Sequence, residues 1–139
     1  MTVRNRICGH CGEVAKSFAR ESFDVELKGQ SIKVRGLSGW RCTVCNEVEF
    51  NAEGAARYST AGDALIAEER ARVAREIKRI RTALRLTQVQ AGRLTGGGPN
   101  AFSRYERGEA KPMPAVLNLL RLLEKHPELM REIQVESEV

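Results

Sequence analysis

Hydrophobic and polar positions alternate with a period of two in the first third of the chain. Between residues 17 and 27 the inward face carries three apolar side chains, Phe23, Val25 and Leu27. Ser22, Asp24 and Glu26 occupy the other face, and this alternation predicts a half-buried β-strand. Residues 28–30 supply a turn, and residues 31–37 return as the second strand of a hairpin with inward residues Ile32, Val34 and Leu37.

A short third strand is expected over residues 47–50, after Trp40 leads the chain into a pair of cysteines. We interpret Trp40 as core packing over that pair, with stacking on a nucleobase as the alternative. A three-stranded sheet of this size must leave at least one edge unpaired. Such an edge can accept a strand from a partner protein.

Helical periodicity replaces the alternation in the second half of the chain. Asn51 is placed to cap a short helix over residues 55–58, and the small and polar residues of 59–63 interrupt the pattern, so we expect a hinge there. From Ala64 to about Leu84 apolar residues recur at three- and four-residue steps. This spacing predicts a long helix with one buried stripe, formed by Val73, Ile77, Ile80 and Leu84.

Two short helices joined by glycines follow. Thr87 is the expected N-cap of the first helix, and Gln90 three residues later completes a capping box. In that helix Val89 and Leu94 are expected to face inward, and Gly92 to allow a close crossing. The glycines of 96–98 end this helix. A second helix is expected with Gly98 as its cap, Pro99 at its first position and residues 100–107 as its body. This is the helix-turn-helix pattern, in which the second helix enters the major groove of DNA.

The second of these helices has an inward and an outward face. Phe102 and Tyr105 are expected to pack inward, whereas the outward set is Asn100, Ser103, Arg104 and Arg107. Because asparagine pairs with adenine and arginine with guanine, Asn100 and Arg104 form a plausible two-base reader. Ser103 would touch either a base or a phosphate.

A further helix, from Pro114 to Leu123, is apolar on more than one face. We expect that one core cannot bury all of its apolar residues and that the second face packs against another copy of the chain. The candidate dimerisation residues are Val116, Leu117 and Leu120. A twofold dimer would present two recognition helices to a palindromic site. His126 is interpreted as a helix-end residue before Pro127, not as a ligand.

The charge balance favours an anionic partner. Lysine and arginine number 23 against 18 aspartates and glutamates, and the pI is about 9.3, so nucleic acid is the leading partner class. Arg72, Arg75 and Arg79 share one face of the long helix, as either a solvated surface or phosphate contacts. No run approaches the roughly 20 apolar residues of a membrane span, and the N-terminus lacks the apolar core of a signal peptide. We therefore expect a cytoplasmic protein.

The four cysteines form two CxxC pairs, Cys8 with Cys11 and Cys42 with Cys45. Each pair places two thiolates on a tight knuckle whose backbone N–H groups can point at sulfur. Two such knuckles complete the tetrahedral four-sulfur shell that zinc prefers. We predict one structural zinc per chain, because a β-domain this small buries little apolar surface of its own.

Other interpretations of the cysteines are weaker. Two disulfides would need an oxidising compartment, and the sequence has no export signal. A thioredoxin-like site needs one CxxC beside a βαβ unit, and no such unit is predicted. Four thiolates leave no open metal position for activated water, which disfavours a metal-dependent hydrolase. His10 lies between two ligands and is kept as an alternative ligand.

Several of these motifs match known families. Residues 86–108, LTQVQAGRLTGGGPNAFSRYERG, resemble the Cro/Xre class of helix-turn-helix, and the resemblance adds Thr87 and Gln88 to the candidate DNA contacts beside Asn100, Ser103, Arg104 and Arg107. GGGPNAFSRYERGEAKP and LLRLLEKHPELMREI, following the two CxxC pairs, resemble the MqsA antitoxin family. That resemblance implies a zinc domain that binds an MqsR-type mRNA-cleaving toxin, a C-terminal dimer, and base reading by Asn100 and Arg104.

The sequence thus predicts an α+β protein, with a small zinc-ribbon-like β domain (1–62) followed by an all-α helix-turn-helix domain (63–139). The expected function is that of a non-enzymatic type II antitoxin. It would neutralise an MqsR-like toxin and repress its own operon by binding operator DNA. The alternative is a stand-alone, zinc-stabilised helix-turn-helix regulator without a toxin partner.

Overall fold

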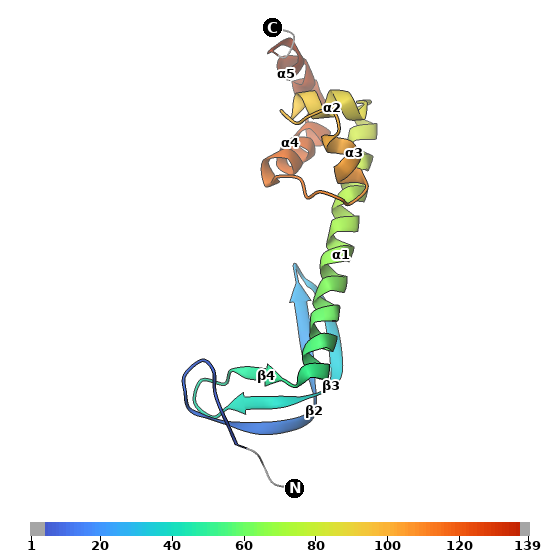
Figure 1. Ribbon diagram of the computed structural model, residues 1–139. Helices are drawn as coiled ribbons and strands as arrows, with labels where there is room; N and C mark the ends of the chain where they lie inside the picture. The colour runs from blue at the N-terminus through green and yellow to red at the C-terminus, as the bar shows by residue number, and fades with distance from the viewer. Residues whose placement is uncertain (1–4, 137–139) are drawn as a thin grey trace. The chain divides into compact units, whose positions relative to one another are not determined.

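The computed structural model describes residues 5–136 of the 139-residue chain. It comprises two compact units, Met1–Ala67 and Glu68–Val139. The first holds an antiparallel sheet and the second holds helices (Figure 1). The predicted α+β class, with a zinc-ribbon-like start followed by helices, is confirmed.

The sheet has four strands, not three, in the order β1-β2-β3-β4. The strands are β1 (Arg6–Ile7), β2 (Val14–Leu27), β3 (Gln30–Cys42) and β4 (Val48–Phe50). Sequence analysis missed β1 because two residues are too few to show alternation. The main hairpin also extends beyond its predicted ends, because β2 and β3 stay paired as far as Ala15 and Cys42.

The hairpin turn lies where the sequence predicts it. Leu27 pairs with Gln30, and the two residues between them have positive φ, 48° at Lys28 and 81° at Gly29. Two left-handed residues in a row define the type I′ turn, whose twist matches that of the flanking strands. The alternation is also confirmed, since Phe23, Val25 and Leu27 are half-buried and the polar residues between them are exposed.

The hairpin is irregular around Arg20. The register of β2 against β3 shifts between Phe18 and Glu21 and again between Glu21 and Phe23. Arg20 has a φ of 56°, and its backbone N–H donates to Ser38 Oγ at 3.2 Å. Bulges of this kind bend a strand and increase its twist.

A cluster of four half-buried aromatic rings packs together in the first unit. Ring centroids lie 5.5 Å apart for Phe18 and Phe23, 4.8 Å for Phe23 and Phe50, and 5.0 Å for Phe50 and Tyr58. The guanidinium of Arg41 lies 4.9 Å from the Phe18 ring centre. These rings come from β2, β4 and α1, so they join the sheet to the helix that follows it.

Helix α1 (Ala52–Ala83) runs without interruption, and the break predicted at residues 59–63 is wrong. Asn51 caps its start as expected, because the Asn51 side chain accepts from the Gly54 backbone N–H at 2.8 Å. Each weak helix former in the predicted break costs only about 1 kcal/mol or less. Contacts of the preceding turn with the sheet, the Tyr58 ring on Phe50 and the Arg57 guanidinium on Arg35 O, help to offset that cost. The two compact units meet inside α1, between Ala67 and Glu68, beyond the expected boundary at residues 62 and 63.

The second unit packs α2 (Gln88–Leu94), α3 (Ala101–Glu106) and α4 (Pro114–Lys125) with the C-terminal part of α1. A 3₁₀ turn (Pro127–Leu129) and α5 (Met130–Glu136) follow. Fully or nearly fully buried side chains form the core: Ile77, Ile80, Leu86, Ala91, Phe102 and Leu120. The predicted stripe of α1 is confirmed, since Val73 and Leu84 border this core.

Two details of the short helices differ from expectation. Val89 is 41% exposed, because the buried face of α2 consists of Ala91 and Gly92 with Leu94 at its border. Pro99 lies in the turn before α3, not in the helix: the Ala101 N–H donates to Gly98 O at 3.1 Å, which closes a turn around Pro99.

The buried face of α2 lies close to the glycine turn. A Cβ added at Gly92 would lie 2.7 Å from the carbonyl oxygen of Gly98. Gly92 therefore allows α2 to lie close to the turn that follows it, and the close crossing expected at Gly92 is made with this turn. His126 ends α4 as expected, donating its backbone N–H to Leu122 O at 2.9 Å.

Candidate functional site

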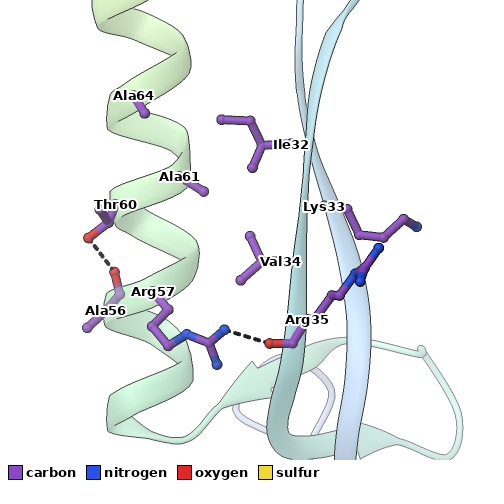
Figure 2. A pocket seen from close by; sticks show the side chains of 9 residues that line it. All are labelled: Ile32, Lys33, Val34, Arg35, Ala56, Arg57, Thr60, Ala61 and Ala64. Atoms are coloured by element: carbon purple, nitrogen blue, oxygen red, sulfur yellow. Dashed lines mark hydrogen bonds between the residues drawn. The ribbon is translucent and has the colours of Figure 1, made fainter.

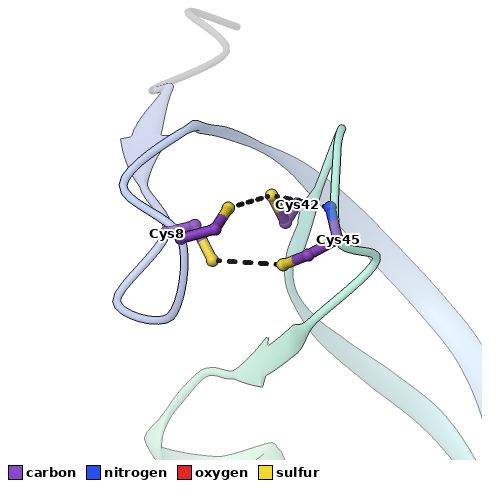
Figure 3. A group of neighbouring side chains, drawn as sticks. Cys8, Cys42 and Cys45 are labelled. Atoms are coloured by element: carbon purple, nitrogen blue, oxygen red, sulfur yellow. Dashed lines mark hydrogen bonds between the residues drawn. The ribbon is translucent and has the colours of Figure 1, made fainter.

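The four cysteines come together at one end of the sheet. Cys8 and Cys11 lie in the loop between β1 and β2, and Cys42 and Cys45 lie where β3 turns toward β4. All four sulfurs lie within 4.8 Å of one another. Cys8 Sγ is 3.7 Å from Cys45 Sγ (Figure 3). Cys11 Sγ is 3.4 Å from Cys42 Sγ.

This geometry fits a tetrahedral metal site. Zn–S bonds of about 2.3 Å place two ligands of a tetrahedron about 3.8 Å apart, close to the sulfur separations of 3.7 Å and 3.4 Å in these two pairs. The predicted N–H groups are present: His10 N donates to Cys8 Sγ at 3.4 Å, and Val44 N to Cys42 Sγ at 3.4 Å. The imidazole of His10 is not part of the cluster, which consists of the four cysteines.

Thiol acidity also favours a bound cation. Backbone N–H groups of Cys45 and Val44 lower the pKa of Cys42 to about 6. At Cys45 a backbone hydrogen bond from Glu47 lowers the pKa, but burial and the neighbouring cysteine thiols outweigh it and raise the pKa to about 12. Four thiols this close cannot all ionise without a positive charge between them. A metal would supply that charge, and four thiolates would leave it no open position for chemistry.

Trp40 is not the buried core residue over the metal site that the sequence suggested. Its side chain is half-buried, and the Arg6 guanidinium lies 4.6 Å from its ring centre. Arg6 also pairs with Glu49, which is opposite Trp40 in the β3–β4 register, at 3.0 Å. Trp40 therefore belongs to a cation–π and ion-pair group on the sheet surface.

The predicted base readers are available for contact. Asn100 is exposed and occupies the N-cap position of α3, but its side chain makes no capping hydrogen bond. Arg104 lies one turn further, is exposed, and has no carboxylate partner among residues 5–133. Ser103, between them, is half-buried.

The other three candidate DNA contacts are already engaged within the chain. Thr87 Oγ1 accepts from Gln90 N at 3.1 Å, and Thr87 N donates to Gln90 Oε1 at 2.9 Å, which confirms the capping box. Gln88 Nε2 donates to Glu106 Oε2 at 2.7 Å. Arg107 pairs with Glu109 at 3.1 Å.

A buried ion pair behind the reading helix was missed by the sequence analysis. Glu106 is 6% exposed at its side chain and pairs with Arg81, whose Nη1 also donates to Leu86 O at 2.8 Å. With Gln88 on the same carboxylate, the network ties the end of α1, the start of α2 and the end of α3 together. One sequence signal was available: Glu106 lies four residues after Phe102, on the inward face of α3.

The arginine face of α1 is paired with carboxylates. Arg72 contacts Glu69 at 2.8 Å, Arg75 contacts Glu68 at 3.2 Å, and Arg79 pairs with Glu124 of α4. These contacts favour the solvated-surface interpretation of this face over phosphate binding.

The candidate dimerisation residues occupy different depths. Leu120 is fully buried in its own chain's core, whereas Val116 and Leu117 lie partly buried at the border of that core. One core therefore buries more of α4 than expected. Two large apolar side chains of this segment stay exposed: Met113, 69% exposed, directly before α4, and Leu122, 47% exposed, on the side of α4 away from Leu117 and Leu120.

The first unit also contains an open groove of about 660 Å³ between β3 and α1. Figure 2 shows Ile32 and Val34 directed toward the helix, where the facing residues are small, including Ala61. The Arg57 guanidinium donates to the carbonyl oxygen of Arg35 at 2.6 Å and so ties α1 to the strand.

Among the described residues, none of the helices combines the length and the apolar composition that a membrane span requires.

Comparison with known proteins identifies the family. The model of a family described as the antitoxin component of the bacterial toxin–antitoxin system, MqsA, matches residues 3–134. Antitoxin MqsA of Escherichia coli (strain K12) is 39% identical over 127 residues, which cover 90% of this chain and 95% of that protein. Such an antitoxin is a regulatory protein and not an enzyme, in agreement with the non-enzymatic antitoxin expected from the sequence. The chain belongs to the MqsA antitoxin family.

Proposed function

We propose that this antitoxin neutralises an MqsR-like mRNA interferase in the cytoplasm and represses its own operon by binding a palindromic operator as a homodimer. The observation that carries the DNA-binding part is α3. It presents Asn100 and Arg104 to solvent, one turn apart, and neither side chain has a hydrogen-bond or ion-pair partner among residues 5–133. Family membership supports the toxin-binding part.

We further propose that the metal at Cys8, Cys11, Cys42 and Cys45 is zinc, with a structural role. Four sulfur ligands in tetrahedral proximity suit Zn²⁺, and the metal would hold together two loops that few apolar contacts support. Metal analysis of the purified chain should find one zinc per chain. Cys8→Ser should lose it, and a Cys8→Ser protein that keeps full metal content would contradict this ligand set.

DNA binding requires a rigidly held reading helix. The Arg81–Glu106–Gln88 network and the buried ring of Phe102 hold α3 against the core. Gln88 and Thr87 lie at the start of α2, the helix that crosses the DNA backbone in helix-turn-helix proteins. Their internal hydrogen bonds would orient them toward phosphate while Asn100 and Arg104 reach the base edges.

Dimerisation is assigned to the face of α4 that carries Val116 and Leu117. Met113, four residues before Leu117 and exposed, would extend this face for a second copy. Leu120 would contribute indirectly, because its buried side chain fixes α4 against the core of its own chain. A twofold pair of second units would place two α3 helices on the two halves of a palindrome.

Toxin capture is assigned to the first unit, residues 1–67. Beyond Val14 and Ala15, which pair with β1, the outer edge of β2 pairs with no other strand in the described residues. An unpaired edge offers backbone hydrogen bonds to an added strand, and the groove between β3 and α1 offers apolar contact.

The proposal is tested with the intact chain in two assays. Co-expression with the ribonuclease encoded next to it should restore growth, and the purified protein should shift a duplex from upstream of its own gene but not a scrambled one. A specific shift without rescue by the folded, metal-loaded protein would favour the stand-alone regulator. Rescue without a specific shift would refute autorepression.

A further inference from the structure

The end of α1 contains a backbone arrangement that normally selects glycine. Arg85 N donates to Thr82 O at 3.0 Å, and Leu86 N donates to Arg81 O at 3.1 Å. This pair of bonds is the Schellman motif, in which the first residue past the helix adopts the left-handed conformation. That residue is Arg85, with a φ of 57°.

Elsewhere in the second unit the chain uses glycine for this conformation. Gly96, after α2, has a φ of 74°, and Gly108, after α3, has a φ of 72°. A side chain with a Cβ is disfavoured at such a position, because the Cβ approaches the carbonyl oxygen. The arginine at position 85 therefore carries a conformational cost that the other two helix ends avoid.

Nothing in the described part of the fold uses the Arg85 side chain. The residue is exposed, and no carboxylate, carbonyl or aromatic ring among those residues contacts its guanidinium. Several arginines of the same unit are engaged, since Arg72, Arg79, Arg81 and Arg121 are paired with glutamates, whereas Arg85, like Arg104, has no such partner in the described residues. Arg85 thus has a conformational cost and no internal partner.

The position of Arg85 in the chain suggests a function for its side chain. Arg85 directly precedes Leu86 and Thr87, the residues that lead into α2. In helix-turn-helix proteins this helix crosses the DNA backbone, and arginine is a common ligand of phosphate oxygens there. We propose that Arg85 is a DNA-contacting residue that binds a backbone phosphate beside the start of α2. This inference rests on the proposed DNA-binding function.

A phosphate contact has a distinct signature, because it strengthens binding to every sequence alike and releases counterions. Removing it lowers the slope of log K against log salt by about 0.9 for each contact. Asn tolerates the left-handed conformation better than most residues, so Arg85→Asn removes the charge without disturbing the helix end. Arg85→Lys keeps a positive charge for the phosphate.

Arg20→Asn is a matched control. Arg20 is also an exposed arginine in the left-handed region, with a φ of 56°, but it lies on β2 in the first unit. The variant removes the same charge from the same backbone conformation. Any general effect of net charge on DNA affinity would therefore appear in both asparagine variants.

The experiment measures thermal unfolding and the affinity of each full-length variant for two duplexes, the region upstream of the chain's own gene and a scrambled sequence, over a series of salt concentrations. Arg85→Asn should unfold at the wild-type temperature or above. It should bind both duplexes about three- to tenfold more weakly at low salt, with a reduced salt slope. Arg85→Lys should retain most of the slope, and Arg20→Asn all of it.

Four results would overturn the inference: an unchanged slope in Arg85→Asn, an equal loss in Arg20→Asn, a loss confined to the specific duplex, or a lower unfolding temperature in Arg85→Asn. The last would show that the fold itself needs the arginine. A wild-type protein that binds neither duplex would refute the proposed DNA-binding function, and the inference with it.

Discussion

Whether an arginine of this chain can reach a nucleic acid depends on the carboxylates around it. Arg72, Arg75 and Arg79 are held by glutamates, and Arg107 by Glu109. Arg104 has no such partner in the described residues. Two arginines on the same short helix, Arg104 and Arg107, therefore differ in the freedom of their guanidinium groups.

Arg104→Ala should lower operator affinity by about 1–3 kcal/mol and relax specificity at one base position per half-site, because a bidentate arginine–guanine contact is lost. Arg72→Ala is the control, since Arg72 is paired with Glu69. Affinities for the operator and for single-base variants of it provide the measurement. An equal loss on specific and random DNA would show that Arg104 does not read a base.

Glu106 is expected to make stability depend on pH. Burial raises the pKa of its carboxyl, but hydrogen bonds from Arg81 and Gln88 outweigh burial, so the pKa in the folded state is lowered. A lowered folded pKa stabilises the protein above the unfolded value of about 4.3. That stabilisation is lost as the pH falls through the lower, folded-state pKa.

Glu106→Gln should therefore cost about 2–3 kcal/mol at pH 7, where it leaves Arg81 without its buried partner, and much less once the pH lies below the folded-state pKa of Glu106. Urea unfolding at pH 7 and at a pH below that pKa measures the difference. Glu109→Gln, which breaks the exposed pair with Arg107, should change stability little at either pH. A cost for Glu106→Gln that does not change with pH would contradict this account.

At the scale of elements, one close contact between the backbone of α2 and the glycine turn positions the short helices. The buried side of α2 meets the glycine turn at Gly92, where a Cβ would lie 2.7 Å from Gly98 O. A backbone oxygen cannot give way as a flexible side chain can, so either the turn or α2 must shift to admit a methyl group.

Gly92→Ala should destabilise the second unit by about 1–3 kcal/mol and weaken operator binding, since α3 begins directly after that turn. Gly98→Ala is the matched control, because a Cβ at Gly98 meets no atom within 4 Å and its φ is not positive. Thermal unfolding and DNA binding are measured on both. Equal behaviour of the two variants would mean that the close approach does not constrain the turn.

At the scale of the whole molecule, two compact units share one helix. The boundary between Ala67 and Glu68 falls within α1, so no loop separates the part proposed to bind the toxin from the part proposed to bind DNA. Each unit nevertheless has its own set of packed side chains: the half-buried aromatic cluster and the cysteine site in the first, and the buried core around Phe102 in the second.

The two activities should therefore be separable by division at this boundary. A fragment of residues 1–67 should neutralise the toxin without shifting operator DNA, and a fragment of residues 68–139 should dimerise and bind DNA without zinc. Growth rescue, gel shift and sedimentation measure these outcomes side by side. A folded, zinc-loaded N-terminal fragment that fails to rescue would show that toxin recognition needs the second unit.

The sequence by itself determined the features that depend on local spacing. The capping box of Thr87 and Gln90, a turn directly after Leu27 and the apolar stripe of α1 all appear as predicted. Each depends on residues a few positions apart, so backbone geometry alone dictates the outcome.

Tertiary structure decided the rest, because the partners lie far apart in the chain. Contacts of α1 with the sheet help to keep residues 59–63 helical despite their weak propensities. Arg79 and Arg121 find glutamates 45 positions away, and Glu106 finds Arg81 across the core. Ion pairs between such distant positions cannot be predicted from sequence spacing. They determine which arginines remain free to bind DNA.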